Sequence, residues 1–83
     1  MSHPKEPEQN QRKYYRTLSL NLRYYRDRLE MTQMQVADLA GCSPKYISLL
    51  ETACFENPPS LPMLFFLADA LQVEPYQLLK PLG

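Results

Sequence analysis

The chain has 83 residues, of which 45% are hydrophobic and 22% are charged, and its nine basic and nine acidic side chains give a net charge of zero. This length suits one small domain with a modest core, and no apolar run approaches the roughly 18 residues of a membrane span. His3 is the only histidine, and Cys42 and Cys54 have neither metal-ligand nor disulfide-framework spacing, so no metal site and no disulfide scaffold is predicted.

Basic and acidic residues are divided unevenly along the sequence. Residues 1–30 contain seven Lys or Arg and four acidic residues, whereas residues 31–83 contain two Lys and five acidic residues. Proteins that bind duplex DNA draw much of their sequence-independent affinity from Lys and Arg that neutralise phosphates. Any such contribution is therefore expected mainly from the N-terminal part.

Residues 1–15 are predicted to form a disordered leader, ahead of a helical domain over residues 16–80. The leader is polar, carries two prolines and has no hydrophobic period. Arg12 and Lys13 could reach a phosphate, although a solvated tail is the simpler interpretation. No signal peptide is recognised, so a cytoplasmic location is expected.

The first helix is expected over residues 17–29. Four apolar residues recur there at helical spacing and predict its buried stripe: Leu18, Leu22, Tyr25 and Leu29.

A helix-turn-helix pattern follows over residues 32–51. Thr32 is a good N-cap, Gln35 can complete a capping box, and Gly41 suits the left-handed position that ends a helix. Ser43 caps the next helix, and Pro44 fits its first position. The apolar faces consist of Val36, Ala37, Ala40, Ile47 and Leu50. The second helix of this unit is expected to be presented outward.

Two more helices are predicted after a loop that contains Asn57-Pro58-Pro59. Phe55 in this loop is expected to be tucked against the core, with exposure as the alternative. Ser60 caps the fourth helix, and a short fifth helix covers about residues 75–79 with Leu78 turned inward. The inward positions of the fourth helix are Leu61, Leu64, Phe65, Leu67, Ala68 and Leu71. No strand pattern competes, so the predicted fold class is all-α.

The run from Met31 to Glu51, MTQMQVADLAGCSPKYISLLE, resembles the DNA-binding domain of phage repressors, Cro proteins and the xenobiotic-response-element (XRE) type of bacterial regulators. The positions that match are Met31, Thr32, Gln33, Val36, Ala37, Ala40, Gly41, Ser43, Ile47, Ser48, Leu50 and Glu51. The resemblance extends from about Leu18 to about Leu79. It implies a five-helix lambda-repressor-like DNA-binding domain with a central helix-turn-helix, acting as a sequence-specific transcriptional regulator.

The resemblance also implies roles for individual residues. The second helix of the unit would lie in the major groove, and Gln33 would bond the DNA backbone. The residues placed at the DNA by that helix are Ser43, Pro44, Lys45, Tyr46, Ser48 and Leu49. Arg26 and Glu51 match the positions of an ion pair that locks two helices together. The simpler interpretations are that Ser43 and Tyr46 only cap and pack the helix, and that Arg26 and Glu51 are two solvated surface charges.

Double-stranded DNA and a second copy of the chain are the expected partners. Met63 and Phe66 fall where the family normally has polar residues, which makes them a possible dimer patch. No cofactor, metal, membrane or small-molecule ligand is expected. Catalysis is also not expected, because the only histidine lies in the leader and two glycines cannot form a phosphate-binding loop.

The sequence departs from the family pattern at several positions. Leu39, Pro44 and Leu49 replace residues that are often polar, so Lys45 is the single cation on the recognition helix. Such a helix would bind DNA weakly, or would read mainly thymine methyl groups and groove shape. Glu30 stands where Gly or Asn is common, and a left-handed conformation there has an energetic cost. The alternative function is a protein–protein interaction module on the same fold with weak or no DNA binding.

Overall fold

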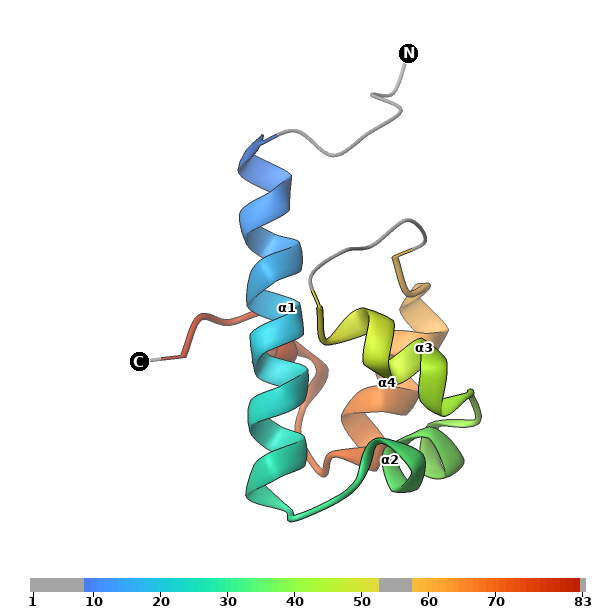
Figure 1. The fold of residues 1–83 in the computed structure, drawn as a ribbon. Helices are drawn as coiled ribbons and strands as arrows, with labels where there is room; N and C mark the ends of the chain where they lie inside the picture. The colour runs from blue at the N-terminus through green and yellow to red at the C-terminus, as the bar shows by residue number, and fades with distance from the viewer. Residues whose placement is uncertain (1–8, 53–57, 83) are drawn as a thin grey trace.

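The computed structural model describes residues 9–52 and 58–82, which form four α-helices and one 3-10 helix and contain no strand. The elements are α1 (Gln9–Arg28), α2 (Gln33–Ala40), α3 (Pro44–Leu50), α4 (Leu61–Ala70) and the 3-10 helix η1 (Pro75–Leu78). In Figure 1, α1 runs along one side of the molecule, and α2, α3 and α4 are grouped on the other. The all-α class agrees with the prediction, but the fifth element is a 3-10 helix rather than an α-helix.

Helix α1 begins at Gln9, well before the start expected at residue 17. Residues 9–15 of the expected leader are therefore helical, while residues 1–8 lie outside the described part of the chain. The segment from Gln9 to Arg16 contains no Pro, Gly or β-branched residue, so its composition does not oppose extension of the helix. Figure 1 shows these first turns of α1 extending past the ends of α3 and α4.

One hydrophobic core joins all five elements. Its buried residues are Leu18, Leu22, Val36, Ala37, Ala40, Ile47, Leu50, Leu64, Leu67, Ala68, Ala70, Leu71 and Leu78. Helix α2 contacts both α3 and α4, and Ala37 at this crossing is fully buried. A small side chain at the crossing lets the helix backbones approach closely. Leu18 and Leu22 are buried as predicted, whereas Tyr25 is only partly buried against the core.

The buried face of α4 differs from the prediction. Leu61 and Phe65 were expected to point inward, but they are 66% and 48% exposed. Met63 was expected to be exposed, but it is partly buried against the core, whereas Phe66 is 53% exposed as expected. Nearly every position of the sequence LPMLFFLADA is apolar. Hydrophobic periodicity therefore does not determine which side of this helix is buried.

Three of the α-helices end in the same left-handed arrangement. Glu30, Gly41 and Gln72 have φ values of 56°, 78° and 60°. In each case the next residue donates its N–H to the carbonyl five positions earlier, at 2.9–3.1 Å. This bond satisfies a carbonyl that the end of the helix would otherwise leave free. The conformation of Glu30 was expected, and that of Gln72 was not.

Two polar side chains of α1 are buried, and both join α1 to distant parts of the chain. Ser19 donates its hydroxyl proton to the Leu50 carbonyl at the end of α3. The Asn21 Nδ2 atom donates to the carbonyls of Leu78 at 2.7 Å and Lys80 at 2.8 Å, while its Oδ1 atom has no partner. Buried amide groups stabilise a fold only when they are hydrogen-bonded. These contacts therefore fix where α3 and the C-terminal segment lie along α1.

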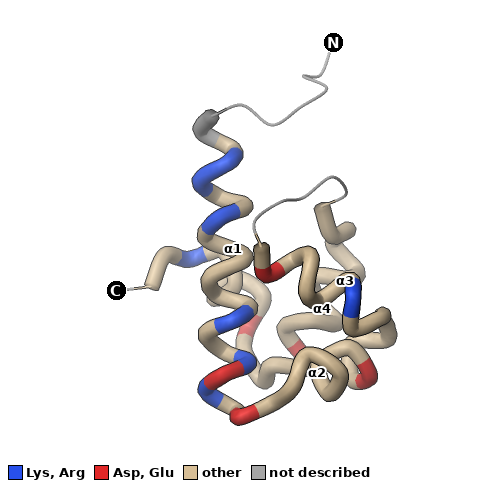
Figure 2. The backbone as a smooth tube through the Cα atoms, viewed as in Figure 1, with Lys and Arg blue, Asp and Glu red and all other residues tan. Residues whose placement is uncertain are grey.

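Charged residues are distributed unevenly over this framework. Figure 2 shows most of the Lys and Arg along α1, whereas the sequence of α3 contains one cation, Lys45. None of the helices in the described ranges combines the length and apolarity needed to cross a membrane.

Candidate nucleic-acid interface

The start of α2 is held by reciprocal hydrogen bonds between its first residues. The Gln35 N–H donates to Thr32 Oγ1 at 3.0 Å, and the Thr32 N–H donates to Gln35 Oε1 at 2.8 Å. This capping box leaves the N–H groups of Gln33 and Met34 available to an external acceptor at the positive end of the helix dipole. The N–H groups at the start of α2 can therefore donate hydrogen bonds to a phosphate oxygen.

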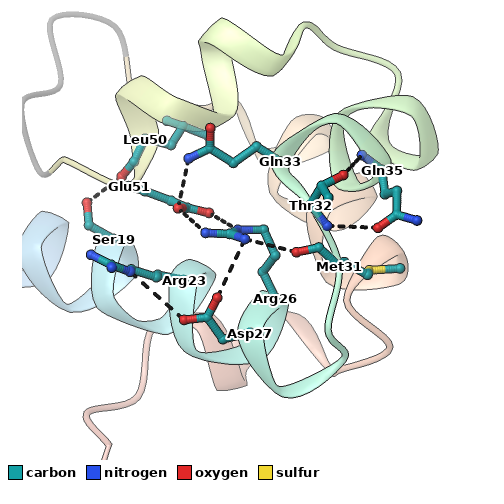
Figure 3. Close-up of polar contacts among 10 residues, drawn as sticks. All are labelled: Ser19, Arg23, Arg26, Asp27, Met31, Thr32, Gln33, Gln35, Leu50 and Glu51. Atoms are coloured by element: carbon teal, nitrogen blue, oxygen red, sulfur yellow. Dashed lines mark hydrogen bonds and ion pairs between the residues drawn. The ribbon is translucent and has the colours of Figure 1, made fainter.

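Arg26 and Glu51 meet in the network drawn in Figure 3, which connects α1, α2 and α3. Arg26 Nε lies 2.7 Å from Glu51 Oε2, and Nη2 lies 2.9 Å from Oε1, so the guanidinium binds both carboxylate oxygens. Arg26 Nη1 also donates to the Met31 carbonyl at 2.9 Å. The hydrogen bond with Glu51 raises the pKa of Arg26, although burial acts in the opposite direction. The network fixes α3 against the end of α1.

Gln33 takes part in the same network. Its Nε2 atom donates to Glu51 Oε1 at 3.1 Å, and its side chain is half-buried. The Nε2 atom of the amide is therefore engaged within the fold. The structure brings Gln33 together with Arg26 and Glu51, which the sequence analysis had treated separately.

Helix α3 presents its first residues to solvent. Ser43 Oγ accepts a hydrogen bond from the Tyr46 N–H at 3.1 Å, and Pro44 occupies the first turn. Ser43, Pro44 and Lys45 are exposed, and Leu49 on the next turn is 49% exposed. These four side chains are free to meet a ligand at the outer face of α3.

Tyr46 and Ser48 are less accessible than the other residues expected at the DNA. Both are half-buried, and Tyr46 packs against the hydrophobic core. Burial raises the pKa of the Tyr46 phenol, with a smaller contribution from Cys42. Tyr46 therefore stays protonated and keeps its O–H as a donor, but much of its ring belongs to the core. Burial likewise raises the pKa of the Cys42 thiol.

The outer surface of the helix-turn-helix unit is more apolar than cationic. Met34 and Leu39 of α2 are each 61% exposed, and Leu49 of α3 lies exposed as well. Lys45 is the only basic residue in α2 and α3. Within the described ranges, no group of three His, Cys, Asp or Glu side chains could hold a metal ion. This surface can contact base methyl groups and one or two acceptors.

Met63 and Phe66 belong to a different surface from the helix-turn-helix residues, because they lie on α4. Phe66 is exposed next to Phe65 and one turn from Leu61–Pro62, whereas Met63 turns toward the core. The exposed apolar residues of α4 are therefore Leu61, Phe65 and Phe66. Cys54 and Phe55 lie outside the described residues.

Ser19 and the Met31 carbonyl contribute to this site, although neither was predicted from the sequence. Ser19 bonds the last residue of α3, and the Met31 carbonyl accepts from Arg26. Ser19 precedes Arg26 by seven residues, or about two helical turns, so both lie on the same side of α1. This spacing was the one available signal for Ser19. A backbone carbonyl leaves no signal in the residue type.

A family model described as helix-turn-helix matches residues 22–78. The restriction-modification controller protein C.AhdI from Aeromonas hydrophila is 28% identical, with a TM-score of 0.71, covering 77% of this chain and 94% of that chain. A hypothetical transcription factor, NHTF, from Neisseria is also 28% identical, with a TM-score of 0.76, covering 96% of this chain and 88% of that chain. No curated protein matches the chain.

Proposed function

We propose, from the premise that this chain belongs to the helix-turn-helix family, that it regulates transcription by binding a specific duplex DNA sequence through the major groove. The family consists of DNA-binding regulators rather than enzymes. The two solved structures compared above carry regulator names, a restriction-modification controller and a transcription factor. The identification as an XRE-type helix-turn-helix domain agrees with the resemblance in the sequence.

The observation that carries this proposal is the outward presentation of α3 on a rigid support. The support consists of the Arg26–Glu51 pair and the core contacts of Ile47 and Leu50. Exposed side chains then stand at the N-terminal end of α3, which is the end that enters the major groove in helix-turn-helix proteins. A firmly held helix keeps those side chains in register with base edges.

The proposed contacts divide into positioning and reading. Gln33 and the first N–H groups of α2 hold a phosphate and set the register. Lys45 donates to guanine O6 or N7, and Leu49 contacts a thymine methyl group. Ser43 and Pro44 approach the groove edge, while the half-buried Tyr46 and Ser48 offer their hydroxyl groups to the backbone. With one cation on α3, much of the sequence preference would come from apolar contacts and groove shape.

We further propose that the chain acts as a homodimer through the exposed face of α4. Leu61, Phe65 and Phe66 are exposed apolar side chains of α4, and exposed apolar patches mark protein interaction sites. Two copies related by a twofold axis would present two α3 helices to half-sites about one helical turn apart. Sedimentation of the wild type and of Phe66→Glu tests this, because loss of a dimer in the variant alone is expected.

The alternative function, a protein–protein interaction module, is favoured by the exposed apolar residues Met34, Leu39 and Leu49. Under this alternative the outer face of α2 and α3 would bind a protein rather than DNA.

A DNA-binding function requires access to the chromosome or a phage genome, so we also propose a cytoplasmic location.

Selection from random duplex DNA distinguishes the two functions. The purified chain is incubated with a pool of random duplexes at low salt, and bound DNA is amplified through several rounds. Enrichment of one roughly palindromic sequence is expected. A pool that stays random after these rounds, together with negligible binding at low salt, would favour the protein-interaction module instead.

A further inference from the structure

The part of α1 that extends past the other helices is basic. Between Gln9 and Arg26 the sequence has five Lys or Arg and no acidic residue. Arg12, Lys13 and Arg16 are all exposed there. Figure 2 shows blue segments, which mark Lys and Arg, in the half of α1 that leads away from α2. The only acidic residue of α1 is Asp27, near its other end, so the positive charge of Arg12, Lys13 and Arg16 has no acidic neighbour within the helix.

Spacing places Arg12 on a particular side of α1. Arg12, Ser19 and Arg26 follow at intervals of seven residues, which is about two helical turns, so the three lie on one side of the helix. Ser19 bonds the Leu50 carbonyl, and Arg26 bonds the Glu51 carboxylate. This side of α1 therefore faces the end of α3, and Arg12 continues it beyond that helix.

Arg16 and Arg23 form a second row directly beside the first. They are also seven residues apart, and each is displaced by only about 40° around the helix from its counterpart four residues earlier, Arg16 from Arg12 and Arg23 from Ser19. Figure 3 shows Arg23 next to Ser19 and Arg26 at the network that supports α3. Arg23 Nε lies 3.9 Å from Asp27 Oδ2, and both side chains are more than half exposed, so this ion pair holds Arg23 weakly. Arg23 can therefore turn to another anion.

The DNA interface assigned to α2 and α3 lacks the charge that duplex binding usually requires. Lys45 is its only free cation, because Arg26 is committed to Glu51. Each phosphate that a protein neutralises adds to affinity through the release of bound counterions. The three arginines Arg12, Arg16 and Arg23 span about 16 Å along α1, which is long enough to meet several phosphates. Guanidinium groups also bind phosphate oxygens in a bidentate manner.

We propose that Arg12, Arg16 and Arg23 form a phosphate-binding surface on α1, which contacts the DNA backbone flanking the base pairs read by α3. The proposal rests on the proposed function, and it assigns to α1 the sequence-independent part of the affinity. The arginines add affinity without altering base preference, because they meet phosphates only. The surface extends the footprint on DNA to the side on which α1 projects.

The test measures affinity against salt concentration for a fluorescent duplex that carries the selected site and about ten flanking base pairs on each side. The variant Arg12→Gln/Arg16→Gln is compared with the wild type and with Arg28→Gln. Arg28 is an exposed arginine of the same helix, but it lies about 160° around α1 from Arg12. Thermal melting is recorded for each variant, and no change is expected, since the substituted side chains are exposed.

The double variant is expected to bind up to roughly tenfold more weakly per lost contact near 0.1 M salt, and its log–log salt slope should be shallower by nearly one unit per contact. The selected sequence should stay the same, and Arg28→Gln should behave as the wild type. On a duplex trimmed to the selected site, the difference between wild type and double variant should disappear.

Three results would overturn the proposal. If the double variant had the same salt slope as the wild type, the proposed phosphate contacts would be rejected, and the proposed DNA-binding function would still stand. An equal loss of affinity in Arg28→Gln would show that the effect comes from the net charge of the protein and not from a surface on one side of α1. Failure of the wild type to bind any duplex would reject the proposed function itself, and with it this surface, and would point to an acidic protein as the partner of α1.

Discussion

Glu51 is the residue on which the position of α3 depends most. Its carboxylate accepts two hydrogen bonds from Arg26 and one from Gln33. The side chains of Arg26 and Glu51 are 15% and 6% exposed, so both charges are largely withdrawn from water. Such charges are tolerated only when paired and hydrogen-bonded, and removing one partner leaves the other uncompensated. The pair therefore gives α3 one defined position.

Replacing Glu51 with Ala is expected to lower the free energy of unfolding by about 3 kcal/mol, because it strands the Arg26 guanidinium. The melting temperature should fall by roughly 10–20 °C. Asp27→Ala is the matched control. Asp27 contacts the same Arg26 at 3.5 Å, but its side chain is 60% exposed, so its loss should cost about 0.5 kcal/mol. Equal melting temperatures for the two variants would show that the Glu51 pair does not hold α3.

Lys45→Ala is expected to weaken binding to the selected duplex several-fold or to relax the preference at one base pair. Its ammonium is the single cation that α3 offers to a base edge or a phosphate. Competition binding with single-base variants of the site measures both effects. Lys80→Ala, at an exposed lysine after η1, serves as the control and should bind normally. If Lys45→Ala left both the affinity and the base preference unchanged, the assignment of α3 to the DNA interface would be rejected.

At the scale of the elements, the helix ends differ in how well their residues suit a left-handed backbone. Glycine adopts this conformation without a Cβ penalty, whereas Glu30 and Gln72 adopt it at a cost. The space around Gly41 is open, with no atom within 4 Å of an added Cβ. Any cost of a side chain at Gly41 would therefore come from its φ of 78° and not from a clash.

Glu30→Gly and Gln72→Gly are each expected to raise the free energy of unfolding by about 0.5–1 kcal/mol, since relief of backbone strain exceeds the added flexibility of the unfolded chain. Gly41→Ala should lower it by about 1 kcal/mol. Urea unfolding measures all three. Destabilisation by both glycine substitutions would mean that the native side chains contribute more than their backbone conformation costs.

The sequence alone was sufficient to predict where helices begin and end when their terminal residues carry local capping signals. Thr32, Gln35, Gly41 and Ser43 act within a few residues of themselves, and the structure has the caps where they were predicted. The buried face of α4 could not be derived, because an almost wholly apolar helix can bury any side. The early start of α1 and the partial burial of Tyr46 could not be derived either. The first depends on how far a helix extends along a permissive sequence, and the second on contacts with distant residues.

At the scale of the whole molecule, Asn21 connects the first helix to the end of the chain. Its amide holds the carbonyls of Leu78 and Lys80, more than fifty residues away in sequence. Its neighbours in the buried stripe are leucines, so sequence patterning treats this position only as the edge of an apolar face. The long-range contact of Asn21 could therefore not be predicted from local spacing.

Asn21→Ala is expected to lower the free energy of unfolding by about 2 kcal/mol, because the buried Leu78 carbonyl loses its donor. Hydrogen exchange should accelerate in the segment that follows η1 more than in α2 and α3. Asn21→Asp keeps the side-chain volume but removes the donors, so it should destabilise at least as much. An Asp variant as stable as the wild type would assign the effect of Ala to the lost volume instead.

The claim that α3 reads DNA in the major groove is tested most directly by chemical interference on the selected duplex. Methylation at guanine N7 modifies the major groove, and methylation at adenine N3 modifies the minor groove. Guanine N7 methylation should block binding in two clusters about one helical turn apart, while adenine N3 methylation within the same half-sites should have little effect. Interference confined to adenine N3, or equal binding of methylated and unmethylated duplex, would contradict the account.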